Sequence, residues 1–243
     1  MNALALRNEL LALLPQWLLD QWLPRMTLVE LPKGYRLDLG SHPRVLYFPI
    51  TCVMAMRIRT ARGPGDFLRF TGHTFVAGMV NMLKAGDIHF EGLVQGSGHA
   101  LTLPATLFAA QLPPSFLGAA PQATAMARIA ENGVQSAYCA NHHGTSQRLA
   151  KILLQAADCF GDERPMTLSQ HELGDILSTR RETVAQLLAD WNAAGLVESH
   201  RARQVILDRG RMQDIACRCY PIVQRFYADE SLLWKAIQWK RSP

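Results

Sequence analysis

Charged and polar side chains gather at residues 178–183, a stretch that reads "STRRET". Arg181 can donate two parallel hydrogen bonds to guanine O6 and N7, and Glu182 can accept one from cytosine N4. Gln186 follows about one helical turn later and can reach a base edge or a phosphate. Side chains of these types at the start of one helix predict contact with the base edges of double-stranded DNA.

The neighbouring hydroxyls and arginines have chemistry suited to the DNA backbone. Arg180 and Thr183 are expected to contact phosphates, and Ser178 and Thr179 can present an amide or a hydroxyl to a phosphate at the helix N-terminus. Further along, the turn "SHRAR" holds two more arginines that could clamp a phosphate. The predicted DNA-binding residues are Ser169, Ser178, Thr179, Arg180, Arg181, Glu182, Thr183, Gln186, Arg201 and Arg203.

Two short helices must position these side chains, and each is predicted to begin with a capping box. Ser169-x-x-Glu172 and Thr179-x-x-Glu182 both match the pattern in which a hydroxyl accepts from a backbone amide and the glutamate reaches back. Only a tight turn at Ser178 separates the helices, so they must cross steeply. The apolar residues on their inner faces are Leu173, Ile176, Leu177, Val184, Leu187, Leu188 and Trp191.

This pair of helices matches a helix-turn-helix, whose second helix presents its N-terminal residues to the major groove. A strand, a basic turn and a second strand follow Gly195, as in winged helices. An αα-corner buried in a core remains an alternative, although it needs none of these arginines. Glu182 also keeps two interpretations, because a residue that closes a capping box has less freedom to reach a base.

The first part of the chain predicts a β-domain. Short runs such as "VLYFPI" and "CVMAMRIR" alternate with glycine-containing turns, which favours a jelly-roll or a small barrel. From about Pro121 the pattern becomes helical. Periodicity alone leaves one stripe of this helix open to two interpretations, a buried core face or a seam between two subunits. The stripe consists of Met126, Ile129, Gly133, Ala137 and Ala140.

The composition is that of a folded protein with a mildly basic balance. Hydrophobic residues make up 49% of the 243 residues, charged residues make up 19%, and the formal net charge is +5. This content excludes a disordered chain, and no run of about 18 apolar residues predicts a membrane span. The apolar N-terminus contains Arg7, Asn8 and Glu9 and predicts an amphipathic helix, not a signal peptide. Five scattered cysteines indicate the reducing cytoplasm.

The sequence resembles the Crp/Fnr family of transcription regulators over nearly its whole length. "TLSQHELGDILSTRRETVAQLLADWNAAGLVESHRARQVILDR" is similar to the winged helix-turn-helix of that family. "LPKGYRLDLGSHPRVLYFPITCVMAM" resembles the opening strands of its cyclic-nucleotide-binding-like β-roll. "CANHHGTSQRLAKILL" looks like the junction before the DNA-binding domain, and "DIACRCY" is similar to a tail found in many members.

The resemblance implies an α+β fold in three parts. Residues 1–118 would form an N-terminal jelly-roll or β-roll sensor domain, and residues 119–143 a long dimerisation helix. Residues 144–243 would form the winged helix-turn-helix domain with a C-terminal tail. The resemblance also implies a homodimer, a roughly palindromic DNA site, a role in transcription, and RNA polymerase as a further partner.

The stretch "VAGMVNMLKAGDIHFEG" departs from the cassette of the cyclic-AMP-binding members, which carry a Gly-Glu pair and an Arg-Ser pair. Met79 replaces the glutamate that holds the ribose hydroxyl, and His89 stands near the position of the arginine that holds the phosphate. Methionine cannot accept that hydrogen bond, and a neutral histidine binds phosphate more weakly than arginine. We therefore expect no cAMP binding in the usual way and leave another effector open. The candidate effector-pocket residues are Gly78, Met79, Val80, His89 and Phe90.

No metal or cofactor site is expected. No cysteine precedes Cys52, so the N-terminal iron–sulfur cluster of the oxygen-sensing members is not expected. One helical turn cannot easily aim both thiols of Cys217-x-Cys219 at one ion, which favours a structural role for them. His142 and His143 are adjacent on a helix and point about 100° apart. The remaining isolated histidines considered are His42, His73, His89 and His99.

The jelly-roll architecture is shared with cupin enzymes, but their clustered histidines are missing, so no enzyme is expected. A second class of function stays open, a small-molecule-binding or interaction protein of the same fold that no longer reads DNA. The basic set Arg180, Arg181, Arg201 and Arg203 separates the two classes, because only a DNA-reading protein needs it.

Overall fold

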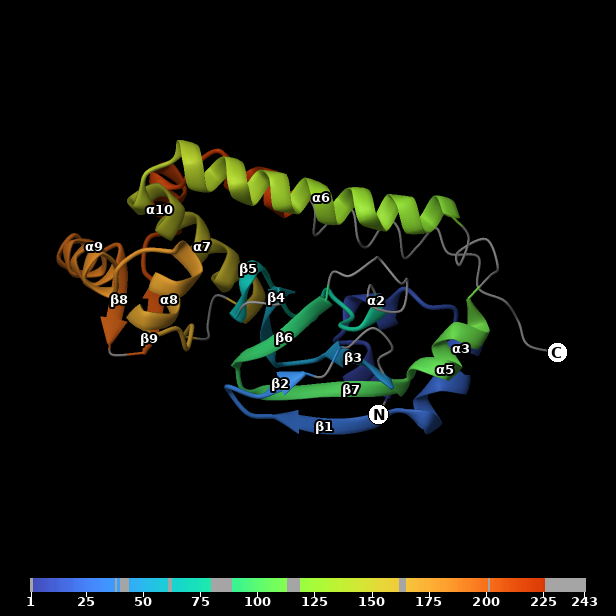
Figure 1. Cartoon of the computed structure of the whole chain (residues 1–243). Coiled ribbons are helices and arrows are strands. Elements are labelled where there is room, and N and C mark those ends of the chain that lie inside the picture. The colour runs from blue at the N-terminus through green and yellow to red at the C-terminus, as the bar shows by residue number, and fades with distance from the viewer. Residues whose placement is uncertain are drawn as a thin grey trace. The chain divides into compact units, whose positions relative to one another are not determined.

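The computed structural model describes residues 2–37, 39, 44–60, 63–79, 89–112, 119–161, 165–200 and 202–225. They divide into two compact units, one ending at Glu131 and the other spanning Asn132–Arg225. Helix α6 (Ala119–His142) contributes to both units (Figure 1). Among the described helices, none is both long and apolar enough to cross a membrane.

The first unit is built on two antiparallel sheets, which confirms the predicted β-domain of an α+β fold. One sheet has the order β1-β7-β3, and the other has the order β2-β6-β4-β5. The strands of the first sheet are β1 (Thr27–Leu31), β3 (Val45–Pro49) and β7 (Gly98–Pro104). Those of the second are β2 (Arg36–Leu37), β4 (Val53–Thr60), β5 (Gly63–Thr71) and β6 (His89–Gly96).

The chain passes from one sheet to the other between β6 and β7. A methyl group at Gly98 would lie 2.5 Å from the backbone nitrogen of Cys52, closer than any side chain tolerates. Glycine is therefore required where β7 starts, and β7 then pairs with both β1 and β3.

Alternation along the strands gives the first sheet two apolar faces. Ala100 of β7 belongs to the core that the two sheets share, together with Met54 and Val94 of the second sheet. Its neighbours Leu101 and Leu103 pack instead against short helices at the N-terminus and after β7. These elements are α1 (Asn2–Ala5), α2 (Glu9–Ala12), α3 (Gln16–Trp22), η1 (Leu23–Arg25) and α5 (Ala105–Gln111).

Helices α3 and α5 lie side by side beyond the end of β7 (Figure 1). The ring centroids of Trp22 and Phe108 are 5.6 Å apart, and Gln111 donates a hydrogen bond to Gln21 over 3.1 Å. The predicted amphipathic N-terminal helix is thus divided into short helices that cover one face of a sheet.

Asn8 fixes this helical layer to the strands, and its side chain is fully buried. Its Nδ2 donates to the carbonyls of Pro49, at 2.9 Å, and Phe75, at 3.1 Å. Its Oδ1 accepts from the amides of Leu10 and Leu11 and so caps α2.

The second unit contains a helical core with a small antiparallel sheet. Val197 of one strand lies opposite Ile206 of the other, and Met166 forms a β-bridge with Gln204 beside them. Tyr220, in the helical segment 219–225, donates to Asp158 over 2.9 Å. The elements are α7 (Thr145–Phe160), α8 (Gln170–Leu177), α9 (Arg181–Ala193), β8 (Val197–His200), β9 (Arg203–Ile206) and α10 (Arg209–Ile215).

Replacing Asn8 with alanine should destabilise the first unit. The change removes a helix cap and leaves two carbonyls without their donor, so we expect a loss of about 2–4 kcal/mol in unfolding free energy. Urea denaturation of the full chain measures it. The control Asn192→Ala, at an exposed position of α9, should cost less than about 0.5 kcal/mol. Equal effects of the two changes would contradict the role given to Asn8.

Candidate nucleic-acid interface

The first predicted capping box is present at the start of α8. The backbone amide of Ser169 donates to Glu172 Oε2 over 2.7 Å, and the amide of Glu172 donates to Ser169 Oγ over 3.2 Å. Both the hydroxyl and the backbone amide of Ser169 are therefore engaged in holding the helix start, and a phosphate contact by Ser169 would have to replace one of these bonds.

The turn between α8 and α9 is held by backbone contacts. Ser178 adopts the left-handed conformation, with φ 51° and ψ 48°, and the amide of Thr179 donates to the carbonyl of Gly174 over 2.9 Å. A methyl group at Gly174 would lie 3.0 Å from the Thr179 carbonyl oxygen. Arg148 of α7 donates to the carbonyl of Leu177 over 2.7 Å and so satisfies the end of α8.

The second predicted capping box, at Thr179 and Glu182, is wrong. Helix α9 starts at Arg181, and the capping position is held by Arg180, which makes no side-chain capping bond. The turn between α8 and α9 is one residue longer than predicted, because the amide of Thr179 still donates to the carbonyl of Gly174 in α8. Glu182 is consequently the second residue of α9 instead of the third, and its exposed carboxylate is released from the capping task.

The start of α9 is open to solvent on the side away from the core. Val184, Leu188 and Trp191 are buried, whereas the predicted DNA-binding residues of this helix are exposed. Gln186 donates to Asp190 over 2.8 Å, a bond that it must exchange to reach a base. The exposed residues are Arg180, Arg181, Glu182, Thr183 and Gln186.

The hairpin after α9 supplies the wing predicted from the sequence. Arg203 is exposed at the start of β9 and lies opposite His200 of β8. Gln204 is fully buried, and it donates to the Leu168 carbonyl over 3.2 Å. Arg201, the other predicted phosphate contact, lies outside the described residues.

Two of the candidate effector-pocket residues pack against different hydrophobic cores of the first unit. Met79 packs on the core beneath the N-terminal helices, whereas Phe90 is buried in the core between the two sheets. Gly78 has a φ of 100°, and a methyl group there would lie 3.0 Å from Leu46 Cδ2. His89 opens β6 opposite Arg59, and Val80 lies outside the described residues.

Three members of the predicted dimer stripe lie in the described side-chain set. Ala137 and Ala140 are exposed, and Gly133 is half-buried. The side chains of Met126 and Ile129 lie outside the described set, although their backbone belongs to α6.

A group of thiols and one imidazole, which sequence reasoning missed, forms elsewhere in the second unit. The ligand atoms of Cys139, His143, Cys217 and Cys219 all lie within 4.8 Å of one another. The premise that Cys217 and Cys219 share a helical turn is wrong, because Cys217 lies in the link after α10 and Cys219 begins the next helical segment. The signal in the sequence was the spacing of four between Cys139, in the last turn of α6, and His143, directly after it, which places both on one side of the chain.

Comparisons with known proteins agree with this arrangement. Residues 147–215 match the family model of the Crp-like helix-turn-helix domain. A search of curated proteins finds no matching sequence.

Solved structures of several regulators share the fold. FixK2 from Bradyrhizobium japonicum is 17% identical with a TM-score of 0.59, and the match covers 79% of this chain and 98% of that one. A Crp-family transcriptional regulator from Thermus thermophilus is 18% identical with a TM-score of 0.54, covering 77% and 96%. The c-di-GMP-responsive global regulator CLP from Xanthomonas campestris is 13% identical with a TM-score of 0.55, covering 80% and 100%. The chain therefore shares its fold with these regulators, and its residues 147–215 match the Crp-like helix-turn-helix domain.

Proposed function

We propose that the protein is a sequence-specific DNA-binding transcription regulator that acts as a homodimer on a roughly palindromic site. The observation that supports it most directly is the exposed N-terminus of α9 within a Crp-like helix-turn-helix. A recognition helix in this position meets base edges with its first residues, while the preceding helix crosses the DNA backbone.

The roles of the exposed residues follow from their chemistry. Arg181 reads guanine, because its guanidinium can donate two parallel bonds to O6 and N7. Glu182, which has no capping task, is the acceptor for a cytosine N4 amine. Arg180 and Arg203 bind phosphates, and the positive end of the α9 dipole adds to that attraction.

Helix α6 is the proposed dimer seam, and the exposure of its described side chains supports this. Val134 is 70% exposed and Tyr138 is 51% exposed, and exposed Ala137 lies between them on the same side of the helix. Cys139 and His143 lie on the opposite side and contact other parts of the second unit. A second copy that packs along the exposed side would bury these apolar groups and place two recognition helices in a symmetric pair.

Control by cAMP through the usual cassette is not part of the proposal. Met79 supplies a thioether where that cassette needs a carboxylate, and its side chain packs on the core of the first unit. An effector of another kind remains compatible with this function.

Substitutions of Arg181 test the reading of DNA. A binding site is first selected from a pool of random duplexes with the full chain. On the selected site, Arg181→Ala should weaken binding about tenfold to hundredfold, which corresponds to about 1–3 kcal/mol. Arg181→Lys should lose most of the preference for the selected site over a scrambled duplex, because an ammonium keeps the positive charge but cannot donate two parallel hydrogen bonds.

The matched control is Arg25→Ala, which removes the same charge from an exposed position of the first unit and should leave specific affinity unchanged. If Arg181→Ala weakened the selected and a scrambled duplex equally, Arg181 would be a phosphate contact. If the protein bound no duplex even at low salt, the alternative of a module that no longer reads DNA would replace the proposal.

The dimer seam is tested by Val134→Glu. If α6 faced only solvent, this change at an exposed position should lower the unfolding free energy by less than about 0.5 kcal/mol. In a dimer seam it buries a carboxylate and should convert the dimer to monomers. Sedimentation at micromolar protein concentration measures it. Leu207→Glu is the control, at another exposed apolar side chain of the second unit, and should leave the dimer intact. A monomeric parent protein, or a dimer unaffected by Val134→Glu, would contradict the seam.

Isothermal titration with cAMP checks the effector assignment. We expect no heat of binding at micromolar concentration, because the ribose hydroxyl and the cyclic phosphate lack their carboxylate and guanidinium partners. Micromolar binding that is abolished by His89→Ala would show that the altered cassette still works.

A further inference from the structure

Four potential metal ligands converge in the second unit from three separate stretches of chain. Cys139 comes from the last turn of α6 and His143 from the residue directly after it. Cys217 comes from the link after α10, and Cys219 from the start of the last described helical segment. We propose that these four side chains bind one Zn²⁺ ion as a closed Cys₃His site. This reverses the expectation that the chain has no metal site, and it does not depend on the DNA-binding function.

The distances fit a single tetrahedral ion. Zn–S bonds of about 2.3 Å and Zn–N bonds of about 2.0–2.1 Å place neighbouring ligands about 3.8 Å apart for two sulfurs and about 3.6 Å apart for sulfur and nitrogen. The sulfurs of Cys139 and Cys217 are 3.6 Å apart, and the sulfur of Cys219 is 3.4 Å from His143 Nδ1. Small adjustments of the side chains would therefore complete the coordination.

The same distances disfavour two other uses of the thiols. An iron–sulfur cluster distributes its four protein ligands over two or four irons, so the whole set must span a greater distance than the ligands of one ion. A disulfide would need its sulfurs at about 2.05 Å, whereas Cys139 and Cys217 are in contact as free cysteines.

The groups around the four ligands complement a zinc thiolate site. Lys151 is buried, and its ammonium donates to Cys139 Sγ over 3.3 Å. Gln135 donates to Cys219 Sγ over 2.9 Å. Three thiolates carry charge −3, so with Zn²⁺ and the Lys151 ammonium the buried group is neutral, which removes the cost of an uncompensated charge.

Contacts outside the cluster fix the C-terminal pair in place. The backbone amide of Cys217 donates to the carbonyl of Gln147 over 3.4 Å. The hydroxyl of Tyr220 donates to Asp158, which also forms an ion pair with Arg209. The segment is thus anchored on α7 on both sides of Cys219.

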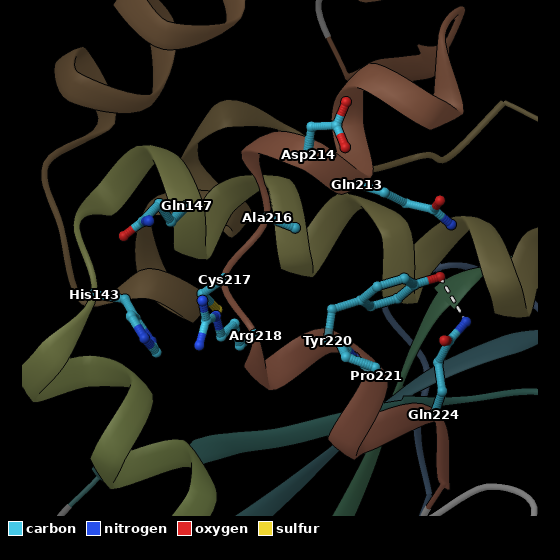
Figure 2. Close-up of a pocket in the computed structure, with 10 residues that line it drawn as sticks. All are labelled: His143, Gln147, Gln213, Asp214, Ala216, Cys217, Arg218, Tyr220, Pro221 and Gln224. Carbon is cyan, nitrogen blue, oxygen red and sulfur yellow. Dashed lines mark hydrogen bonds between the residues drawn. The ribbon is translucent and has the colours of Figure 1, made fainter.

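An open pocket of about 650 Å³ gives the ion a route to the site. His143 and Cys217 line it on one side, with Gln147 above them and Arg218 beside them (Figure 2). Tyr220 and Gln224 form its other end, where Gln224 donates to the Tyr220 hydroxyl (Figure 2). Because all four coordination positions belong to the protein, the ion would have a structural role and would join the end of α6 to the segment after the winged helix.

The test uses the full chain, freed of metal with a chelator under reducing conditions and then titrated with Co²⁺ alone. We expect one equivalent to bind and to give the visible absorption of tetrahedral cobalt with thiolate ligands, which one equivalent of Zn²⁺ then abolishes. Elemental analysis of the untreated protein should find about one zinc per chain. Thermal unfolding should shift to lower temperature on chelation and return with Zn²⁺.

Cys217→Ser should abolish the cobalt–thiolate absorption, whereas Cys159→Ser, at a half-buried cysteine of α7 outside the cluster, should preserve it. If Cys217→Ser fails to fold, the Co²⁺ titration of the parent protein still tests whether the metal site exists. Absence of thiolate absorption in the parent, unchanged absorption in folded Cys217→Ser, iron with acid-labile sulfide, or a Cys139–Cys217 disulfide in the reduced preparation would each overturn the proposal.

Discussion

A glycine lets the backbone of the turn approach α8 closely enough to fix the direction of α9. Any side chain at Gly174 would press on the carbonyl of Thr179, and the turn that follows passes through a left-handed Ser178. The capping bonds of Ser169 and the bond from Arg148 to Leu177 hold the two ends of α8. Because these contacts are made by backbone groups and by half-buried side chains outside α9, the exposed residues of α9 are left free to meet DNA.

Helix α6 has two different proposed roles, one on each of two opposite sides. Its exposed side carries Val134 and Tyr138, which suit a second copy of the chain, and its other side carries Cys139 and His143. An ion bound there would tie this helix to the segment that follows the winged helix, and so would connect the proposed seam and the DNA-reading module within one unit. The stability of that connection would then depend on zinc instead of on a larger apolar core.

Local patterns predicted the parts of the fold that depend on local contacts. The strand runs, the inner faces of α8 and α9 and the Ser169 capping box could all be predicted because hydrophobic alternation and capping involve neighbours in sequence. The second capping box was misplaced because the length of the turn is set by the approach of Thr179 to Gly174, a tertiary contact. The assignment of β6 and β7 to different sheets also escaped prediction, since it depends on the close passage of Gly98 by Cys52. The cysteine cluster escaped prediction for the same reason, because nothing in the sequence shows that residues near 140 meet residues near 218.

The function proposed for the protein depends on sequence-specific DNA reading by α9. The most direct measurement compares the affinity of the full chain for a selected duplex and for a scrambled one across a range of salt concentrations. We predict a preference of at least about 10³-fold and an affinity that falls steeply with salt, by about 0.9 log units per phosphate contact for each tenfold increase. Equal affinity for both duplexes, or no binding at low salt, would contradict the account.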